Sequence, residues 1–545
     1  MTALSAQTPV SPAWPASLPG HGARWSGRAR DRVAVLVLLV VGLGVGLVAT
    51  KLTIADPFLL FRLARVEAWL SSGAFIPYGL NVGVFDEQRP LFEMILASLA
   101  IGTGLTPLQI AILPVGAVVL PIAAYGLCQR LLRDRLLAVL LAMALVLNHA
   151  FATVHLGTFI YVWSTLLLLA FLGVLANMLS TGKSTIAVVV LAALYFVTEA
   201  LYQTTATWMI LVLLAVSVVA WIDRRRGIRT TVVVASGALA LACLAYFLYF
   251  DRSFQTAFLA SLARHGTGSQ LSNAIDGLLA QLNVALWAGP RAVMPYEASA
   301  PPNVVAAGAI IAQWALFGLA GVAGLAALAR SKFRPPVSAL RGRWVFLIAV
   351  GVAAVGHTAI YALYGHFSPR VISLLGGVLG AVFLANAGLP SRAIRLWAVA
   401  LVIASLSGSV AFFAASPPAE SSAASEAAAQ WLLAQAPKPA VTADLGLYGR
   451  LLLTASAENR VIELVDLDSC AFSHIVDAAP TCGAERVARF VVFSRRDLEQ
   501  PMQSIAWKAF GPPARYWQAI SANPAQRLVY DNDGIVIFER QVGGS

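Results

Sequence analysis

Long apolar runs separated by short polar segments dominate the chain. Runs such as 33–50, 204–222 and 304–329 reach or approach the roughly 20 apolar residues that a helix needs to cross a bilayer. Marking every such run predicts eleven membrane-spanning helices, at residues 33–51, 108–129, 136–150, 159–178, 184–200, 204–222, 230–250, 304–329, 344–363, 370–388 and 396–414. The pattern therefore predicts an α-helical polytopic membrane protein.

Four more polar regions lie outside these runs. Residues 1–32 contain Pro9, Pro12, Pro15 and Pro19 without a periodic apolar pattern, which predicts a disordered tail. Residues 52–107 and 251–303 are too long for mere connections, and loops of that length are usually functional or carry helices of their own. We therefore expect a tail (1–32), a membrane domain (33–414) with two long loops, and a separate terminal domain (415–545).

The terminal region has the pattern of a small α/β domain. The segment AAAQWLLAQAPK predicts a helix, and AVTADLGLYGRLLL predicts a strand, a turn and a helix. RVIELV and RFVVFS predict strands, and RLVYDNDGIVIFER predicts a hairpin around Asp533-Gly534. The region contains none of the GxSxG, P-loop, HExxH or paired CxxC motifs, so nothing in it indicates a separate catalytic site.

Composition excludes a soluble enzyme. The residues AVILMFWYC make up 59% of the 545 residues and charged residues only 12%, with a mean hydropathy of +0.76. Soluble domains are about half apolar and a quarter charged.

The net charge of +12 is explained by topology. Placing the N-terminus in the cytoplasm puts 19 of the 38 Lys and Arg residues in short inner segments that hold only three acids, Asp31, Asp134 and Asp223. The inner side then carries +16 and the rest of the chain −4. Because Lys and Arg in short cytoplasmic loops orient helices, we expect a multi-pass protein of the plasma (inner) membrane with its terminal domain outside. No nucleic-acid partner is needed to explain the basic charge.

The first outer loop begins with an amphipathic pattern. In DPFLLFRLARVEAWLSSG, which starts at Asp56, apolar residues recur at helical spacing at Leu59, Leu63, Val66 and Leu70. This predicts a helix on the bilayer surface, capped by Asp56 and ended at Gly73. After Arg89-Pro90 comes an apolar helix of roughly 13 residues, which is too short to span and is re-entrant or interfacial.

This loop resembles the GT-C glycosyltransferases, which are polytopic enzymes that use polyprenyl-phosphate-linked sugars. The shared features are an acidic residue after the first span, an interfacial helix, the turn GAFIP, an acidic residue before a basic-Pro step and the helix LFEMILAS. Residues 73–104 are similar in layout to the aminoarabinose-transferase and protein O-mannosyltransferase branch. DPFLLFRLARVEAWLSSG also resembles the DPYYxxRxxxxxxxxG segment of oligosaccharyltransferase catalytic subunits.

The resemblance implies an active site at the outer membrane face. Asp56 would be the catalytic carboxylate, with acidic help from Asp86 or Glu87, and the partners would be a polyprenyl-phosphate sugar donor and an extracytoplasmic acceptor. Glycosyl transfer needs a carboxylate to take the acceptor's proton, and positive charge or a divalent metal to hold the leaving phosphate.

Arginine suits the phosphate because it can donate two parallel hydrogen bonds. The candidates are Arg62, Arg89 and Arg370, and an arginine near the position of Arg370 resembles one that faces donor or acceptor in GT-C enzymes. Arg62 and Arg65 are equally placed to act as headgroup anchors, and Arg370 to anchor a helix end.

The sequence departs from the oligosaccharyltransferase pattern at two motifs. One is the Glu-bearing motif of the later long outer loop, where residues 287–303 offer only Glu297 and Arg291. The other is the second acidic motif, which should fall near residues 148–158, where the chain has His149 and His155 and no carboxylate. These histidines suit a metal or phosphate contact, or a structural role. These departures argue against transfer of a whole oligosaccharide.

Two ionisable residues fall within predicted spans. Glu199 lies at the outer end of the fifth span and His357 within the ninth. Ionisable groups there are costly and mark sites by default. They leave open a membrane transporter or flippase, and the missing acidic motif leaves open an inactive GT-C-like scaffold.

Cysteines play a minor part in these expectations. Cys470 and Cys482 lie in the terminal domain, where an outer compartment permits a disulfide. Cys128 and Cys243 fall in spans, where we expect them to be buried and inert.

Overall fold

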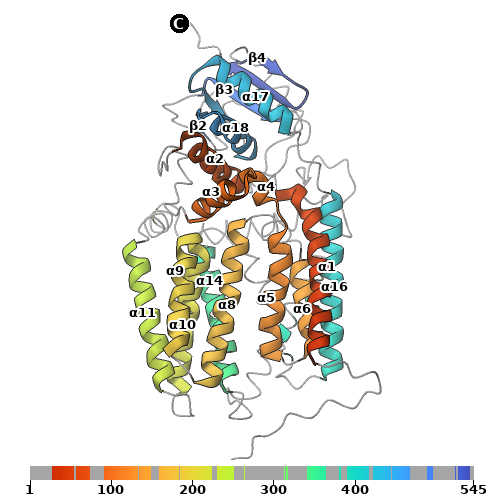
Figure 1. Cartoon of the computed structure of the whole chain (residues 1–545), viewed down its shortest axis with the longest axis vertical. Coiled ribbons are helices and arrows are strands. Elements are labelled where there is room, and N and C mark those ends of the chain that lie inside the picture. The colour runs from red at the N-terminus through yellow and green to blue at the C-terminus, as the bar shows by residue number, and fades with distance from the viewer. Residues whose placement is uncertain are drawn as a thin grey trace, which may run out of the picture.

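The computed structural model is mostly helical, with a small sheet near the C-terminus (Figure 1). It describes residues 27–53, 57–73, 91–132, 134–148, 159–182, 185–223, 230–250, 341–363, 390–415, 422–443, 445–466, 488–494 and 526–540, with a few single positions between them.

The apolar runs form the helices that the sequence predicts. They are α1 (Gly27–Thr53), α5 (Val115–Leu132), α6 (Arg135–Val146), α8 (Phe159–Thr181), α9 (Thr185–Leu201), α10 (Gln203–Asp223), α11 (Thr230–Phe250), α14 (Arg341–Leu363) and α16 (Ser391–Ala415). Within the described residues, five apolar helical stretches are long enough to cross a bilayer. The chain is therefore a multi-pass membrane protein. Residues 304–329 and 370–388 lie outside the described part apart from single positions, so the number of eleven spans stays a prediction.

Polar contacts join α1, α5 and α6 at the ends of these helices that lie away from the sheet domain (Figure 1). Asp31 of α1 accepts hydrogen bonds from the Tyr125 hydroxyl at 3.0 Å and from Gln129 Nε2 at 3.2 Å, and it pairs with Arg135 Nε at 2.9 Å. Helix α1 begins at Gly27, whereas the sequence predicts a disordered tail to residue 32. The difference has a physical reason, because Asp31 belongs to this polar cluster and holds the first turns of α1 against α5 and α6.

Small residues let α1 approach α5 closely. A Cβ on Gly42 would meet the backbone carbonyl of Ala117, and a Cβ on Gly46 would lie 2.5 Å from the Cβ of Pro114. Gly44, on the same helix, has nothing within 4 Å of the position that a Cβ would take. Gly42 and Gly46 therefore form a small-residue contact of the kind that joins membrane helices.

This contact makes Gly42→Ala an informative substitution. We expect it to destabilise the protein by about 1–3 kcal/mol, because the new methyl group clashes with a backbone atom that cannot rotate away. Gly44→Ala is the matched control and should be neutral or stabilising by roughly 0.5–1 kcal/mol, since alanine restricts the unfolded chain. Thermal unfolding in detergent measures both variants, and equal midpoints would contradict the close α1–α5 contact.

The terminal domain is the α/β unit that the sequence predicts. Its elements are α17 (Ser422–Gln435), β1 (Ala440–Thr442), α18 (Leu445–Ala457), β2 (Glu463–Asp466), β3 (Phe490–Ser494), β4 (Gln526–Asp531) and β5 (Ile535–Arg540). The strands lie in the order β2-β1-β3-β5-β4, with β1 parallel to β2 and β3 and with β5 antiparallel to β3 and β4. The predicted hairpin is confirmed, and its turn residue Asp533 has a φ of +64°.

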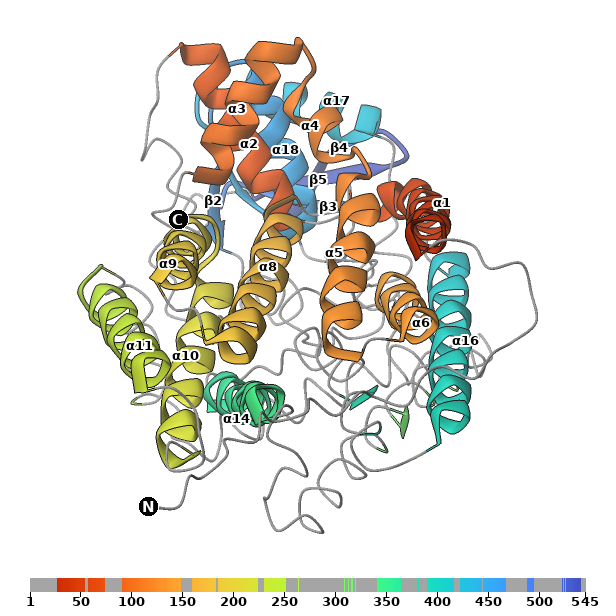
Figure 2. The same ribbon diagram turned by 60° about the horizontal axis from the view of Figure 1, so that its bottom comes forward.

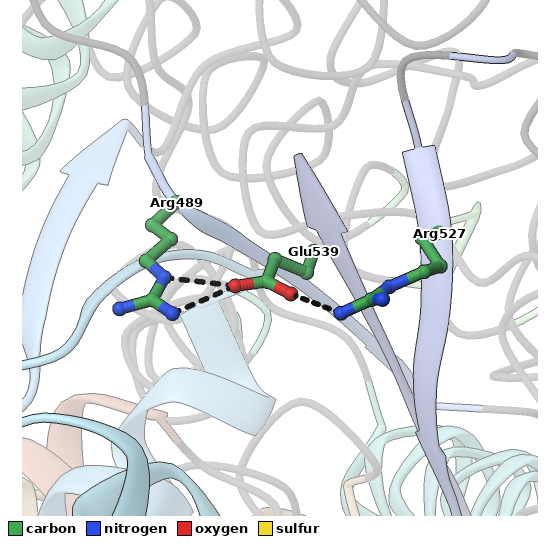
Figure 3. Close-up of polar contacts among 3 residues, drawn as sticks. All are labelled: Arg489, Arg527 and Glu539. Carbon is green, nitrogen blue, oxygen red and sulfur yellow. Dashed lines mark hydrogen bonds and ion pairs between the residues drawn. The ribbon is translucent and has the colours of Figure 1, made fainter. Parts of the chain in front are cut away.

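An ion cluster on the sheet joins three of its residues (Figure 3). Arg489 donates from Nε and Nη2 to Glu539 Oε1 at 3.0 and 2.7 Å, and Arg527 Nη2 donates to Glu539 Oε2 at 2.9 Å. These hydrogen bonds, first that of Arg489, hold the pKa of Glu539 below its ordinary value.

The lowered pKa makes terminal-domain stability depend on pH. Ionised Glu539 stabilises the fold above its ordinary pKa of about 4.3, and this contribution is lost as the pH falls through the lower folded-state pKa. We expect Glu539→Gln to unfold more easily at pH 7 and to lose less stability on acidification than wild type. Both differences should be small and should shrink with added salt, because the arginines are largely exposed. Acid titrations monitored by circular dichroism measure the effect, with exposed Glu426→Gln as the control.

Candidate functional site

Three short helices form a layer between the membrane helices and the sheet domain (Figures 1 and 2). They are α2 (Pro57–Ser72), α3 (Leu91–Thr103) and α4 (Pro107–Ala111). Helix α2 begins at the proline after Asp56 and ends at Gly73, whose φ of +64° suits a glycine that terminates a helix. Helix α3 has the 13 residues that the sequence predicts. The segment that resembles GT-C enzymes thus supplies most of this layer.

One face of α2 packs toward the membrane helices. Leu63 and Val66 are fully buried against Phe92 and Leu96 of α3. Leu201, at the end of α9, belongs to the same apolar cluster, which also includes Ile110 of α4. The layer is therefore fixed to the ends of the membrane helices by an apolar core.

The opposite face of α2 belongs to the core of the terminal domain. Phe61 and Ala64 are buried among α17 and α18, and the ring of Phe61 lies 5.6 Å from that of Tyr448. The Ser71 hydroxyl also donates to the carbonyl of Ser456 at 3.1 Å. Protein therefore covers both of these faces of α2, whereas the sequence pattern predicts that one of them lies on the bilayer surface. The physical reason is a second apolar stripe, at positions 61 and 64, which allows protein to cover both faces.

A buried charge cluster joins α2 to α3. Arg62 Nη1 donates to Glu93 Oε1 at 2.9 Å, and Arg65 Nη1 reaches the same oxygen at 3.4 Å. The Glu93 side chain is completely buried, whereas 13% of each arginine side chain is exposed. The Arg62 guanidinium also lies over the ring of Phe92, 5.8 Å from its centre. The cluster therefore carries one buried negative charge and two partly exposed positive charges.

Glu93 is a candidate site residue that sequence reasoning missed. It stands in the apolar segment LFEMILASLAIG, where a single carboxylate among apolar residues was the available signal. Its place in the first turn of α3 is favourable for an anion because the helix dipole is positive there. Glu67 of α2 takes no part in this cluster within the described residues, and its partial burial raises its pKa.

Two other predicted site residues lie inside the helix bundle. Glu199 on α9 is 3% exposed, and His357 on α14 is 1% exposed, with its ring 6.3 Å from that of Trp208. Both residues lie within apolar helices, as the sequence predicts, and whether these two helices span the membrane stays a prediction. Cys128 and Cys243 are likewise buried and unpaired with each other.

The remaining predicted site residues lie outside the described part of the chain. They are Asp56, Asp86, Glu87, Arg89, His149, His155, Arg370 and the cysteine pair Cys470 and Cys482. Among the described residues, no three or more His, Cys, Asp or Glu side chains come together as metal ligands. The residues most suited to a divalent metal by chemistry, such as Asp56 and Asp86, are in that undescribed set.

Comparison with solved structures finds proteins that are similar to this chain. No protein-family model and no curated protein matches the sequence. ArnT from Cupriavidus metallidurans bound to undecaprenyl phosphate is similar over 95% of this chain and 99% of its own, with 12% identity and a TM-score of 0.47. The same protein in its apo state matches over 94% and 98%, with 13% identity and a TM-score of 0.39.

An oligosaccharyltransferase is also among the similar structures. The Archaeoglobus fulgidus enzyme, in complex with zinc and sulfate, is similar over 84% of this chain and 68% of its own, with 13% identity and a TM-score of 0.46.

Proposed function

We propose that the chain is an integral-membrane glycosyltransferase that moves a sugar from a polyprenyl-phosphate-linked donor to an extracytoplasmic acceptor. The observation that carries the proposal is the layer formed by α2, α3 and α4. Its sequence resembles GT-C enzymes over residues 50–105, and it lies between apolar helices and a polar domain. A lipid-borne donor and a water-borne acceptor would meet at such a boundary.

Asp56 is the proposed catalytic carboxylate. In the sequence it directly precedes Pro57, the first residue of α2. In the reaction, the acceptor oxygen forms a bond to the anomeric carbon of the sugar while the bond from that carbon to the phosphate oxygen breaks. Asp56 takes the acceptor proton, Asp86 or Glu87 assists, and the lipid phosphate leaves as an anion.

Arginines are the proposed ligands of that phosphate. Arg62 supports this role because part of its side chain is exposed at the layer, and Arg89 and Arg370 complete the proposed set. A divalent metal would stabilise the same negative charge, and sensitivity of transfer to a chelator tests for it. The proposed acceptor-binding unit is the terminal domain, which the shared apolar core holds against α2.

The test is transfer of radiolabelled sugar in membranes with and without the protein. A panel of polyprenyl-phosphate sugars serves as donors, and label should move to an extracytoplasmic glycan, lipid or protein only when the protein is present. Absence of transfer with every donor would refute the proposal. Movement of labelled lipid or solute across the membrane without bond formation would instead indicate a transporter.

A further inference from the structure

The carboxylate of Glu93 uses only one of its two oxygens within the described part of the chain. Both arginines contact Oε1, whereas Oε2 is buried and has no hydrogen-bond partner. A buried carboxylate oxygen without a partner costs free energy, so Glu93 is held less firmly here than a carboxylate whose two oxygens both accept hydrogen bonds. The cluster is thus not a fully satisfied ion pair.

The two arginines also make fewer hydrogen bonds to Glu93 than their guanidinium groups could donate. Each guanidinium directs a single nitrogen, Nη1, at Glu93, and the second contact is long at 3.4 Å. Arginine binds carboxylate and phosphate best through two parallel hydrogen bonds. Neither Arg62 nor Arg65 makes such a paired contact with Glu93.

Solvent exposure is unequal within the cluster. Glu93 is completely buried, and the arginine side chains are the part of the cluster that reaches the surface. An anion that approaches the layer therefore meets the arginine side chains before the buried carboxylate. The summed charge of the three side chains is positive, which favours an anion over a cation.

We propose that Arg62 and Arg65 form a phosphate-binding site in which Glu93 is the internal counter-ion that an incoming phosphate displaces. Its lipid ligand, a polyprenyl phosphate, rests on the proposed function, whereas the anion site rests on the cluster alone. In the absence of ligand, Glu93 orients the two guanidinium groups and balances part of their positive charge. When phosphate binds, the arginines exchange one carboxylate oxygen for several phosphate oxygens.

If Glu93 is a displaceable counter-ion, Glu93→Gln should strengthen phosphate binding and not weaken it. A residue that merely clamps α2 to α3 would weaken every property of the site when altered. A displaceable counter-ion competes with the ligand, so replacing it with neutral glutamine should tighten phosphate binding by about tenfold. Arg65→Gln should weaken binding by a similar factor of about ten, because it removes one of the guanidinium groups.

The experiment is equilibrium binding to the purified full chain in detergent at pH 8. The probes are a labelled polyprenyl phosphate, the matching polyprenol without phosphate, and inorganic phosphate. Glu67→Gln is the matched control, because it removes one acidic group from α2 outside the cluster. We expect it to bind all three probes as wild type does.

The outcomes separate the anion site from the lipid donor. Tighter binding of both phosphate probes by Glu93→Gln, with polyprenol unchanged, supports the full proposal. Tighter binding of inorganic phosphate alone keeps the anion site and removes polyprenyl phosphate as its ligand. Unchanged or weaker phosphate binding by Glu93→Gln, or the same gain in Glu67→Gln, would overturn the counter-ion role.

Arg65→Gln keeps the site testable if Glu93→Gln does not fold. Unchanged phosphate binding by Arg65→Gln would itself exclude the site. Sugar transfer by wild type reports separately on the proposed function, whichever way the binding results fall.

Discussion

Asp56→Asn is expected to reduce sugar transfer by about a hundredfold or more, because an amide cannot accept the acceptor's proton. Asparagine is chosen because it caps a helix as well as aspartate does, so the start of α2 at Pro57 should be preserved. Loss of transfer would then report on the carboxylate and not on the fold of the layer. Initial rates in membranes with equal amounts of wild-type and variant protein measure the effect.

Two further variants control this result. Asp533→Asn makes the same chemical change at a hairpin position with a φ of +64°, which asparagine tolerates, and it should transfer at the wild-type rate. Glu199→Gln tests the transporter alternative, because a buried ionisable residue in α9 would matter most for a pathway through the bundle. Full transfer by Asp56→Asn would remove Asp56 from the mechanism.

The membrane helices could be predicted because a bilayer imposes a strict local requirement. A spanning helix needs about 20 apolar residues in one run, and such runs are visible in sequence without any tertiary information. The strands of the terminal hairpin could also be predicted from sequence, since Asp533-Gly534 is a local turn signal between them. Elements with a local signature were therefore predicted with nearly correct bounds.

The environment of α2 could not be predicted in the same way. The apolar stripe at Leu63 and Val66 was evident, but the partners of Phe61 and Ala64 are almost four hundred residues further along the chain. Periodicity indicates that a face is apolar and does not identify what covers it. Lipid and a distant protein domain satisfy the same pattern.

Glu93 illustrates a second limit. Its partners Arg62 and Arg65 precede it by 31 and 28 residues. The sequence shows a carboxylate in an apolar helix, but only the packing of α2 on α3 brings the two arginines to it. The GT-C resemblance drew attention to Asp56, Asp86 and Glu87. It also included the helix LFEMILAS, but only as a short apolar helix, so it gave Glu93 no role.

Phe61→Ala is expected to loosen the terminal domain from the layer, with a loss of about 3–5 kcal/mol in the stability of that contact. Phe61 is 6% exposed and packs with its ring against Tyr448, so its removal leaves a cavity between α2 and α18. The cavity is costly because both helices are fixed on their other sides, by α3 and by α17, and cannot close together. Thermal unfolding and limited proteolysis of the full chain in detergent measure the loss.

The same variant tests whether the terminal domain positions the catalytic layer. Helix α2 carries Arg62, and Asp56 directly precedes it in the sequence. Loosening the face of α2 that packs on α18 should therefore lower sugar transfer, even though Phe61 touches no substrate in the proposed reaction. Phe196→Ala, at a position 42% exposed on α9, is the matched control and should have much smaller effects. If Phe61→Ala unfolds early but transfers normally, the terminal domain stabilises α2 without positioning it. If both variants unfold like wild type, the shared core of α2 and α18 does not form.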